Sequence, residues 1–211
     1  MFPYLYLLQL RCMWSFDKVG PLQTVDLEVL IAQPSLPPAA AENGVAGGLG
    51  QVIHEVIYGD ELHQCGLKES CPRRHVAISV YSGKNKDDEP KICVDGRFVV
   101  ARNLNRAGRG LNIVVLNATS KQVLRVGHFD TYEQDSSTLE VFLEDAIPGE
   151  MVIVVSFDEA SSKLSNMAKQ MFYELGSGLV QNLKFRASWY FIGQKGIQGF
   201  TPFEEVSIRD T

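Results

Sequence analysis

An apolar run near the middle of the chain places the strongest constraint on its fold. Residues 151–155, MVIVV, are apolar without alternation, which is typical of a central strand covered on both faces. Helical patterns flank this run, one from a predicted capping box at residues 137–140 to Pro148 and one over residues 164–175 up to Gly176. Both repeat apolar residues at intervals of three and four, so each predicts an amphipathic helix that packs on the sheet.

Further strand patterns surround this unit. Short β-rich runs occupy residues 76–81, 92–94, 97–100, 111–116, 123–126 and 189–192. Asp95-Gly96 separates two of them and predicts a two-residue hairpin turn, because both residue types accept a positive φ. The order of strands, helix, strand, helix and strand predicts an α/β (α+β) class. We expect a compact, single-domain β-β-α sandwich around one mixed sheet.

The N-terminal part differs in composition from the rest. Residues 33–50 are rich in Pro, Ala and Gly and predict a mobile linker, while residues 25–31 carry a weak strand signal and residues 51–62 have no clear period. Residues 1–64 are therefore predicted to be a leader or extension, and residues 65–211 the domain. Residues 1–10 are apolar, but they are shorter than the ~20 residues of a membrane span and make a poor signal peptide.

Charge and motifs exclude several classes of function. The 211 residues carry a net charge of -5, which disfavours a protein that binds nucleic acid through backbone electrostatics. The sequence has neither a Gly-x-Ser-x-Gly elbow nor a phosphate-binding loop. Five possible metal ligands lie near one another but lack the compact pairs of zinc sites: His54, His63, Cys65, Cys71 and His75. We expect no catalytic residues, no metal and no cofactor.

An ordered set of motifs covers about residues 65–205. It begins with Cys65, Cys71-Pro72, His75 and residues 90–93, and continues through GRGLNI at 108–113, FDTY at 129–132, FDE at 157–159, LGS at 175–177, residues 185–196 and PFE at 202–204. As a set, these motifs resemble the PANDER or interleukin-like EMT inducer family of secreted, cytokine-like proteins. The same module forms the stem of a Golgi O-linked-mannose N-acetylglucosaminyltransferase.

The resemblance implies a domain that binds and does not catalyse. Its first implication is a secreted, extracellular signalling domain that acts through a protein receptor. The alternative is a carbohydrate-binding module that recognises β-linked N-acetylglucosamine, free or in the Golgi lumen. Neither interpretation involves nucleic acid or a membrane span.

The resemblance also implies a disulfide between Cys65 and Cys93. The family's C-terminal cysteine is absent, so Cys71 lacks its family partner. Cys71 could pair with Cys12, link two chains into a dimer, or stay free. In a cytosolic protein all four cysteines would be reduced.

Four residues are candidates for sugar binding. In the transferase stem, the positions that match Arg109, Asp158 and Arg186 contact the sugar, and the indole of Trp189 is suited to stacking on a sugar face. The alternative is a structural Arg–Asp pair that ties three loops together, with Trp189 in the core. Separately, Asn117-Ala118-Thr119 is an N-glycosylation sequon in a predicted turn.

Overall fold

The structure is a computed structural model that describes residues 8–14, 51–53, 56–72, 75–83 and 86–208. Residues 8–14 and 51–53 are described by their backbone. The predicted linker at 33–50 and the weak strand signal at 25–31 lie outside the described residues.

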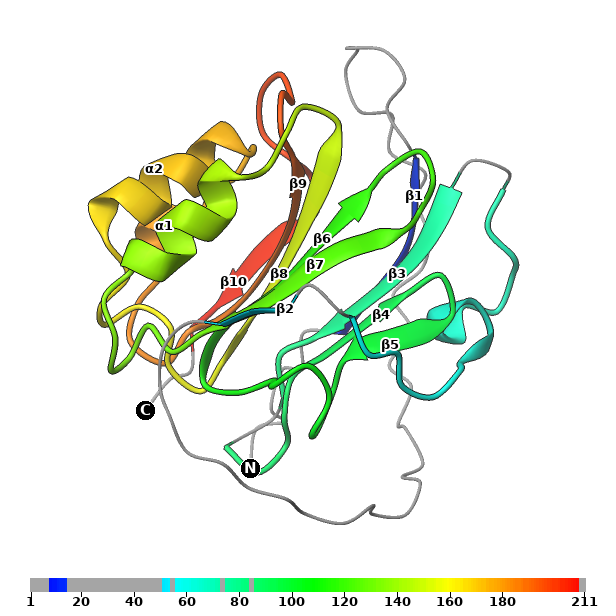
Figure 1. Ribbon diagram of the computed structural model, residues 1–211, viewed down its shortest axis with the longest axis horizontal. Helices are drawn as coiled ribbons and strands as arrows, with labels where there is room; N and C mark the ends of the chain where they lie inside the picture. The colour runs from blue at the N-terminus through cyan, green and yellow to red at the C-terminus, as the bar shows by residue number, and fades with distance from the viewer. Residues whose placement is uncertain (1–7, 15–50, 54–55, 73–74, 84–85, 209–211) are drawn as a thin grey trace.

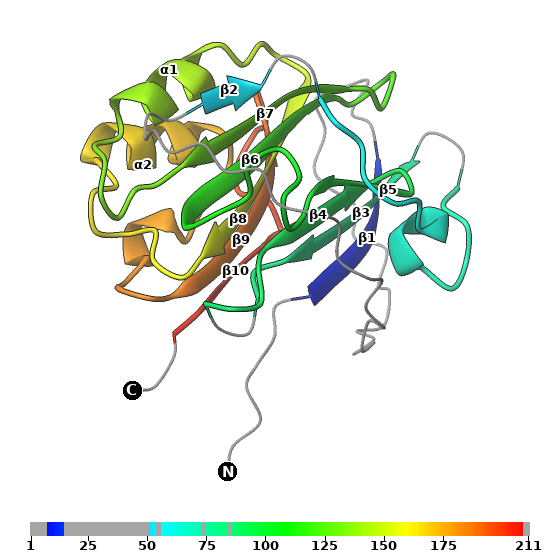
Figure 2. The same cartoon turned by 60° about the horizontal axis from the view of Figure 1, so that its bottom comes forward.

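The described strands form two antiparallel sheets (Figures 1 and 2). The four-stranded sheet has the order β1 (Leu8–Trp14), β3 (His75–Tyr81), β4 (Lys91–Val94) and β5 (Arg97–Val100). The six-stranded sheet has the order β10 (Glu204–Ser207), β9 (Ser188–Gln194), β8 (Glu150–Phe157), β6 (Gly110–Asn117), β7 (Val123–Phe129) and β2 (Gln51–Ile53). The predicted α+β class is confirmed, but in place of one mixed sheet there are two antiparallel ones.

The elements stack in three layers. Apolar side chains of both sheets meet in one core, in which Ile78 of β3 and Ile92 of β4 belong to the same cluster as Ile153 of β8. Helices α1 (Ser137–Glu144) and α2 (Asn166–Glu174) cover the opposite face of the six-stranded sheet, as Figure 1 shows, and form a second core with it. Because β8 lies between the two cores, it is buried along its whole length. This confirms the covered central strand predicted from its unbroken apolar run.

The predicted hairpin is present at Asp95-Gly96. Both residues have positive φ values, 47° and 92°, between β4 and β5. The predicted capping box, in contrast, is wrong. Ser136 is the N-cap of α1; the Ser137 hydroxyl donates to Asp135, and the Glu140 carboxylate accepts from Ser165. Each partner of the expected box is therefore engaged elsewhere, and Glu140 links α1 to the start of α2.

Two segments of the predicted extension take part in the sheets. β1 pairs with β3 from Leu8 opposite Tyr81 to Trp14 opposite His75, and β2 pairs with β7. The N–H of Gly59 also donates to the carbonyl of Phe98, 2.8 Å away, on the edge strand β5. β3 was predicted from the β-rich run at residues 76–81, whereas β1, β2 and β10 were not expected.

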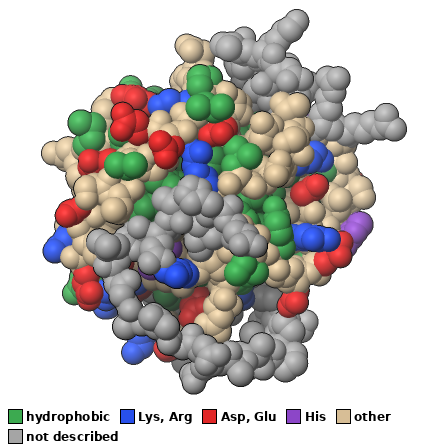
Figure 3. Space-filling model, viewed as in Figure 1, with side chains coloured by type: hydrophobic (Ala, Val, Ile, Leu, Met, Phe, Trp, Pro, Cys, Tyr) green, Lys and Arg blue, Asp and Glu red, His purple; other side chains and the backbone are tan. Residues whose placement is uncertain are grey.

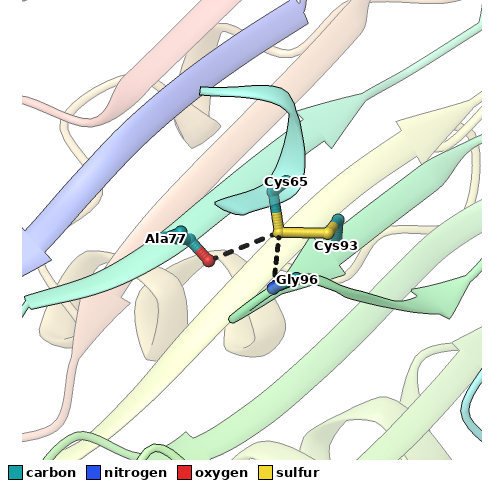
Figure 4. Close-up of a disulfide and its surroundings, with 4 residues drawn as sticks. All are labelled: Cys65, Ala77, Cys93 and Gly96. Atoms are coloured by element: carbon teal, nitrogen blue, oxygen red, sulfur yellow. Dashed lines mark hydrogen bonds between the residues drawn. A yellow bond between two sulfur atoms is a disulfide. The ribbon is translucent and has the colours of Figure 1, made fainter. Parts of the chain in front are cut away.

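A disulfide fastens the 3-10 helix η1 (His63–Gly66) to β4. Cys65 and Cys93 are joined, with their Cα atoms 5.7 Å apart, and both are buried. Figure 4 shows the bond beside the hairpin turn, where the N–H of Gly96 donates to Cys65 Sγ at 3.2 Å. This is the pairing that the family resemblance implied.

Cys71 is disulfide-bonded as well, and the structure holds a single chain. Neither a free thiol at Cys71 nor a disulfide-linked dimer through it fits this arrangement. Cys12 lies in β1, opposite Ala77 of β3 in the backbone register.

Candidate functional site

Polar side chains gather at one end of the six-stranded sheet. Arg109 directly precedes β6, and Asp158 directly follows β8, whose last residue pairs with the first of β6. Asp130 follows β7 in the same way, and Arg186 lies two residues before β9. Because neighbouring strands are antiparallel, the start of one and the end of the next meet at the same edge, toward the lower left in Figure 1. Three of the four predicted site residues are therefore brought to one end of the sheet.

Arg109 is held by its own surroundings. Its Nη2 lies 2.7 Å from Asp130 Oδ2 and 2.7 Å from Glu133 Oε1, and its guanidinium lies over the Tyr132 ring, 4.5 Å from the centroid. The hydrogen bond to Asp130 raises the pKa of Arg109 above its usual range despite desolvation. With two carboxylates and a ring already engaged, Arg109 mainly shapes the loop after β7.

The Arg186 guanidinium makes fewer and longer contacts with carboxylates than that of Arg109. The Arg186 Nε lies 3.8 Å from Asp158 Oδ1, and 60% of the Arg186 side chain is exposed. Exposed ion pairs contribute only about 0–1 kcal/mol. The guanidinium also lies 5.5 Å from the ring centroid of Phe185, which is itself 60% exposed. Arg186 and Phe185 thus form an exposed cationic and aromatic pair that is available to a ligand.

A buried carboxylate positions this pair. Glu159 is only 2% exposed, and its Oε1 accepts from the N–H and hydroxyl groups of Ser161 and Ser162 at 2.6–3.1 Å. Its Oε2 accepts from the backbone N–H of Arg186. Burial alone would raise the pKa of Glu159, but these donors outweigh it and lower the pKa. Glu159 therefore joins the loop after β8 to the loop before β9.

The backbone at the exposed pair is strained. Arg186 has a φ of 56°, in the left-handed region that long side chains rarely adopt. Such strain persists only where neighbouring contacts enforce it, and here the Glu159 bond to the Arg186 N–H does so. We name the surface formed by Arg109, Tyr132, Asp158, Phe185 and Arg186 the strand-end surface.

Trp189 is not part of this surface. Its side chain is fully buried between the sheet and α2, 5.2 Å from the Phe172 ring, and its Nε1 donates to Glu204 Oε1 at 2.9 Å. The expected stacking of Trp189 on a sugar does not fit this position, because no ligand reaches a residue enclosed by the core. The alternative interpretation, a core tryptophan beside an Arg–Asp pair, matches the geometry.

Several residues of the site were not singled out in the sequence. Asp130, Tyr132, Glu159 and Phe185 all lie within the family-like motifs but had no assigned role. Their positions close to the ends of predicted strands could have indicated a role, because binding residues are frequent on the loops that connect strands. Side-chain identity alone did not distinguish the buried Glu159 from its partly exposed neighbour Asp158.

Acidification is expected to destabilise the fold in two steps. Burial lowers the pKa of His128 from its ordinary value of 6.5, although its Nε2 lies 2.7 Å from the Arg109 carbonyl. The unfolded chain then binds more protons, so this stability is present above pH 6.5 and is lost as the pH falls toward the folded pKa. For Asp130 burial opposes the shift, but Arg109 outweighs it and lowers the pKa from 3.8, which adds a second loss below that pH.

Urea unfolding of the protein and of a His128→Gln variant at pH 7.5, 6.5 and 5.5 measures the first step. The variant should lose less stability over this range, because glutamine retains a donor for the Arg109 carbonyl and does not titrate. Equal slopes for both proteins would contradict the assignment to His128.

The fold and the strand-end surface define a class: a disulfide-containing α+β domain with a rigid set of loops at one end of its larger sheet. Residues 109–197 match the family model described as interleukin-like EMT inducer. The chain is 36% identical to human FAM3A and to human FAM3D, and 35% identical to FAM3C of Danio rerio, over 143 residues in each case. These matches cover 68% of this chain and 62%, 64% and 63% of the three relatives. The chain therefore contains a domain of the ILEI/FAM3 (PANDER-like) family.

The family is one of secreted, cytokine-like and generally non-enzymatic proteins, and the buried disulfide is consistent with the secretory pathway. Among the helices that the structure describes, none is long and apolar enough to cross a membrane. Groups of three or more His, Cys, Asp or Glu side chains suited to a metal are also absent from the described residues.

Proposed function

We propose that this chain is a secreted, cytokine-like binding domain that acts through a protein partner and contacts it with the strand-end surface. The family domain gives the class of function. The observation that carries the choice of surface is the exposed Arg186–Phe185 pair on a backbone fixed by buried Glu159.

The chemistry of the surface supports a protein partner. Arginine and large aromatic side chains are enriched among the residues that dominate binding energy in protein interfaces. Tyr132 is partly exposed beside Arg109, and Phe185 beside Arg186, so the surface offers two such pairs. The loops that carry the two pairs are each bonded to the loop after β8: Lys163 N donates to the Thr131 carbonyl at 2.7 Å, and the Arg186 N–H donates to Glu159. These bonds limit the entropy lost on binding.

The face in Figure 3 adds an argument about charge. Lys and Arg side chains on it are scattered among acidic ones and form no continuous basic field. A partner that binds this face is therefore expected to depend on shape and a few anchoring side chains more than on long-range attraction.

Binding of the labelled full chain to the surface of responsive cells tests the proposal. We expect saturable binding, weakened about tenfold or more by Arg186→Ala and by Phe185→Ala, as for residues that anchor an interface. Lys195→Ala is the matched control, because Lys195 directly follows β9 at its other end, away from Arg186. It should leave binding unchanged.

A competition arm separates the two candidate ligands. Free N-acetylglucosaminide in excess should not reduce binding; if it does, the carbohydrate-binding alternative holds, with Asp158 and Arg186 as the polar contacts. Saturable binding that survives both Arg186→Ala and Phe185→Ala would instead place the partner on another surface. The absence of any saturable binding would contradict the receptor function itself.

A further inference from the structure

The turn between β6 and β7 has the features of a modification site. Asn117 is the last residue of β6, and Asn117-Ala118-Thr119 is the single N-glycosylation sequon of the whole sequence. We infer that Asn117 carries an N-linked glycan, and that this glycan lies at the opposite end of the sheet from the strand-end surface. The inference goes beyond the proposed binding function and shares with it the secretory location.

The Asn117 side chain is oriented by the turn. Its Oδ1 accepts from the backbone N–H of Thr119 at 2.9 Å and of Ser120 at 2.8 Å. These bonds leave Nδ2, the atom that is glycosylated, without an acceptor among the described residues. Thr119 and Ser120 are exposed, whereas Ala118 is buried and anchors the turn to the core. A glycan on Nδ2 therefore projects from the fold without displacing a packed side chain.

The chemistry requires one co-reactant, a lipid-pyrophosphate-linked oligosaccharide donor. Nδ2 attacks the anomeric carbon of the donor sugar, a C–N bond forms, and the C–O bond to the pyrophosphate breaks. The amide gives up one proton, and the lipid pyrophosphate leaves with the bonding electrons. The transferase for this reaction acts in the secretory pathway, and the sequon supplies the Asn and Thr that it recognises.

The position of the glycan follows from the sheet. β6 runs from Gly110, beside Arg109, to Asn117, and at ~3.4 Å per residue its ends are roughly 25 Å apart. Figure 1 shows the β6–β7 turn far from the loops that follow β7 and β8. Lys121 of this turn lies 3.7 Å from Asp95 of the β4–β5 turn, so the glycan covers the hairpin end of the molecule. It leaves the strand-end surface open to a partner.

The test uses the full chain expressed in mammalian cells, both as it stands and behind a cleavable secretory leader. Secreted protein is treated with peptide N-glycosidase and its mass is measured. We expect the loss of one glycan, with Asn117 converted to aspartate. Thr119→Ala should abolish the mass change and Thr119→Ser should retain it. Both variants keep the backbone N–H that donates to Asn117. After the same enzyme treatment, Thr119→Ser and the parent should therefore unfold at the same temperature.

Each outcome decides a different point. Leader-directed, folded protein secreted without a glycan overturns the inference and leaves the proposed function standing. Glycosylated protein that appears only with the added leader supports the site, and the proposed function is then decided by the cell-binding experiment. A glycan that persists in Thr119→Ala also overturns the assignment, because the sequence has no second sequon.

Discussion

Trp189→Ala is expected to lower the free energy of unfolding by about 3–5 kcal/mol, the range for truncating a large buried aromatic residue. The indole is fully buried, lies edge-on to Phe172 at 5.2 Å and stacks with Phe191 at 5.8 Å between ring centroids. Its removal leaves a cavity between the sheet and α2, and it also leaves a carboxylate oxygen of Glu204 without the indole donor. Chemical unfolding followed by far-UV circular dichroism measures the loss.

Two further variants sharpen this prediction. Trp189→Phe keeps an aromatic ring and loses the N–H, so it should cost less than the alanine change. Arg186→Ala, at the exposed pair, should change stability by no more than about 0.5 kcal/mol. A Trp189→Ala protein that is as stable as the parent but fails to bind would contradict the core assignment and restore Trp189 as a contact residue.

Glu204 holds Trp189 in the core through a hydrogen-bond network that the sequence does not reveal. Its Oε1 accepts from the Ser177 hydroxyl and the Trp189 indole, and its Oε2 accepts from the N–H of Gly178 at 2.7 Å and Leu179 at 3.1 Å. β10, the loop after α2 and β9 thus converge on one carboxylate. The motif residues at 175–177, 189 and 202–204 maintain this network, and their spacing in sequence does not reveal that they meet.

The elements predicted correctly from the sequence are those whose residue pattern lies within a single continuous segment. The covered strand β8, the helix α2 and the turn at Asp95-Gly96 each follow from residues within one segment, and each is present. β1 and β10 are edge strands, and their pairing is defined by β3 and β9 and not by a pattern of their own. The capping box failed for a related reason, because Glu140 bonds to Ser165, 25 residues away.

Part of the site could be predicted from patterns of this local kind. Arg109, Asp158 and Arg186 precede or follow strands that the sequence identifies, so their convergence follows once the antiparallel order is known. The sequence does not reveal that the Arg109 guanidinium is bound by two carboxylates whereas that of Arg186 is largely exposed. This difference depends on Asp130 and Glu133, which engage the first guanidinium at 2.7 Å, and on Glu159, which fixes the backbone of the second.

Replacing both Cys65 and Cys93 with alanine should lower the free energy of unfolding by about 3–4 kcal/mol, the chain-entropy value for a loop of this length. The bond spans 28 residues and fastens η1 to β4. Its loss also removes the sulfur that accepts from the Gly96 N–H at 3.2 Å, so the hairpin turn loses a contact. For a chain of this size the expected fall in melting temperature is roughly 10 °C.

Calorimetry of the parent and the double variant under non-reducing conditions measures this difference. The variant keeps the disulfide of Cys71, so the comparison isolates one bond, and intact mass confirms its oxidation state. Adding reductant to the double variant then reports the contribution of the Cys71 bond by itself. Equal melting temperatures for parent and variant would show that the segment before β3 is held by its backbone contacts with β5 and not by the disulfide. In that case Gly59, whose N–H donates to Phe98, would be the next position to alter.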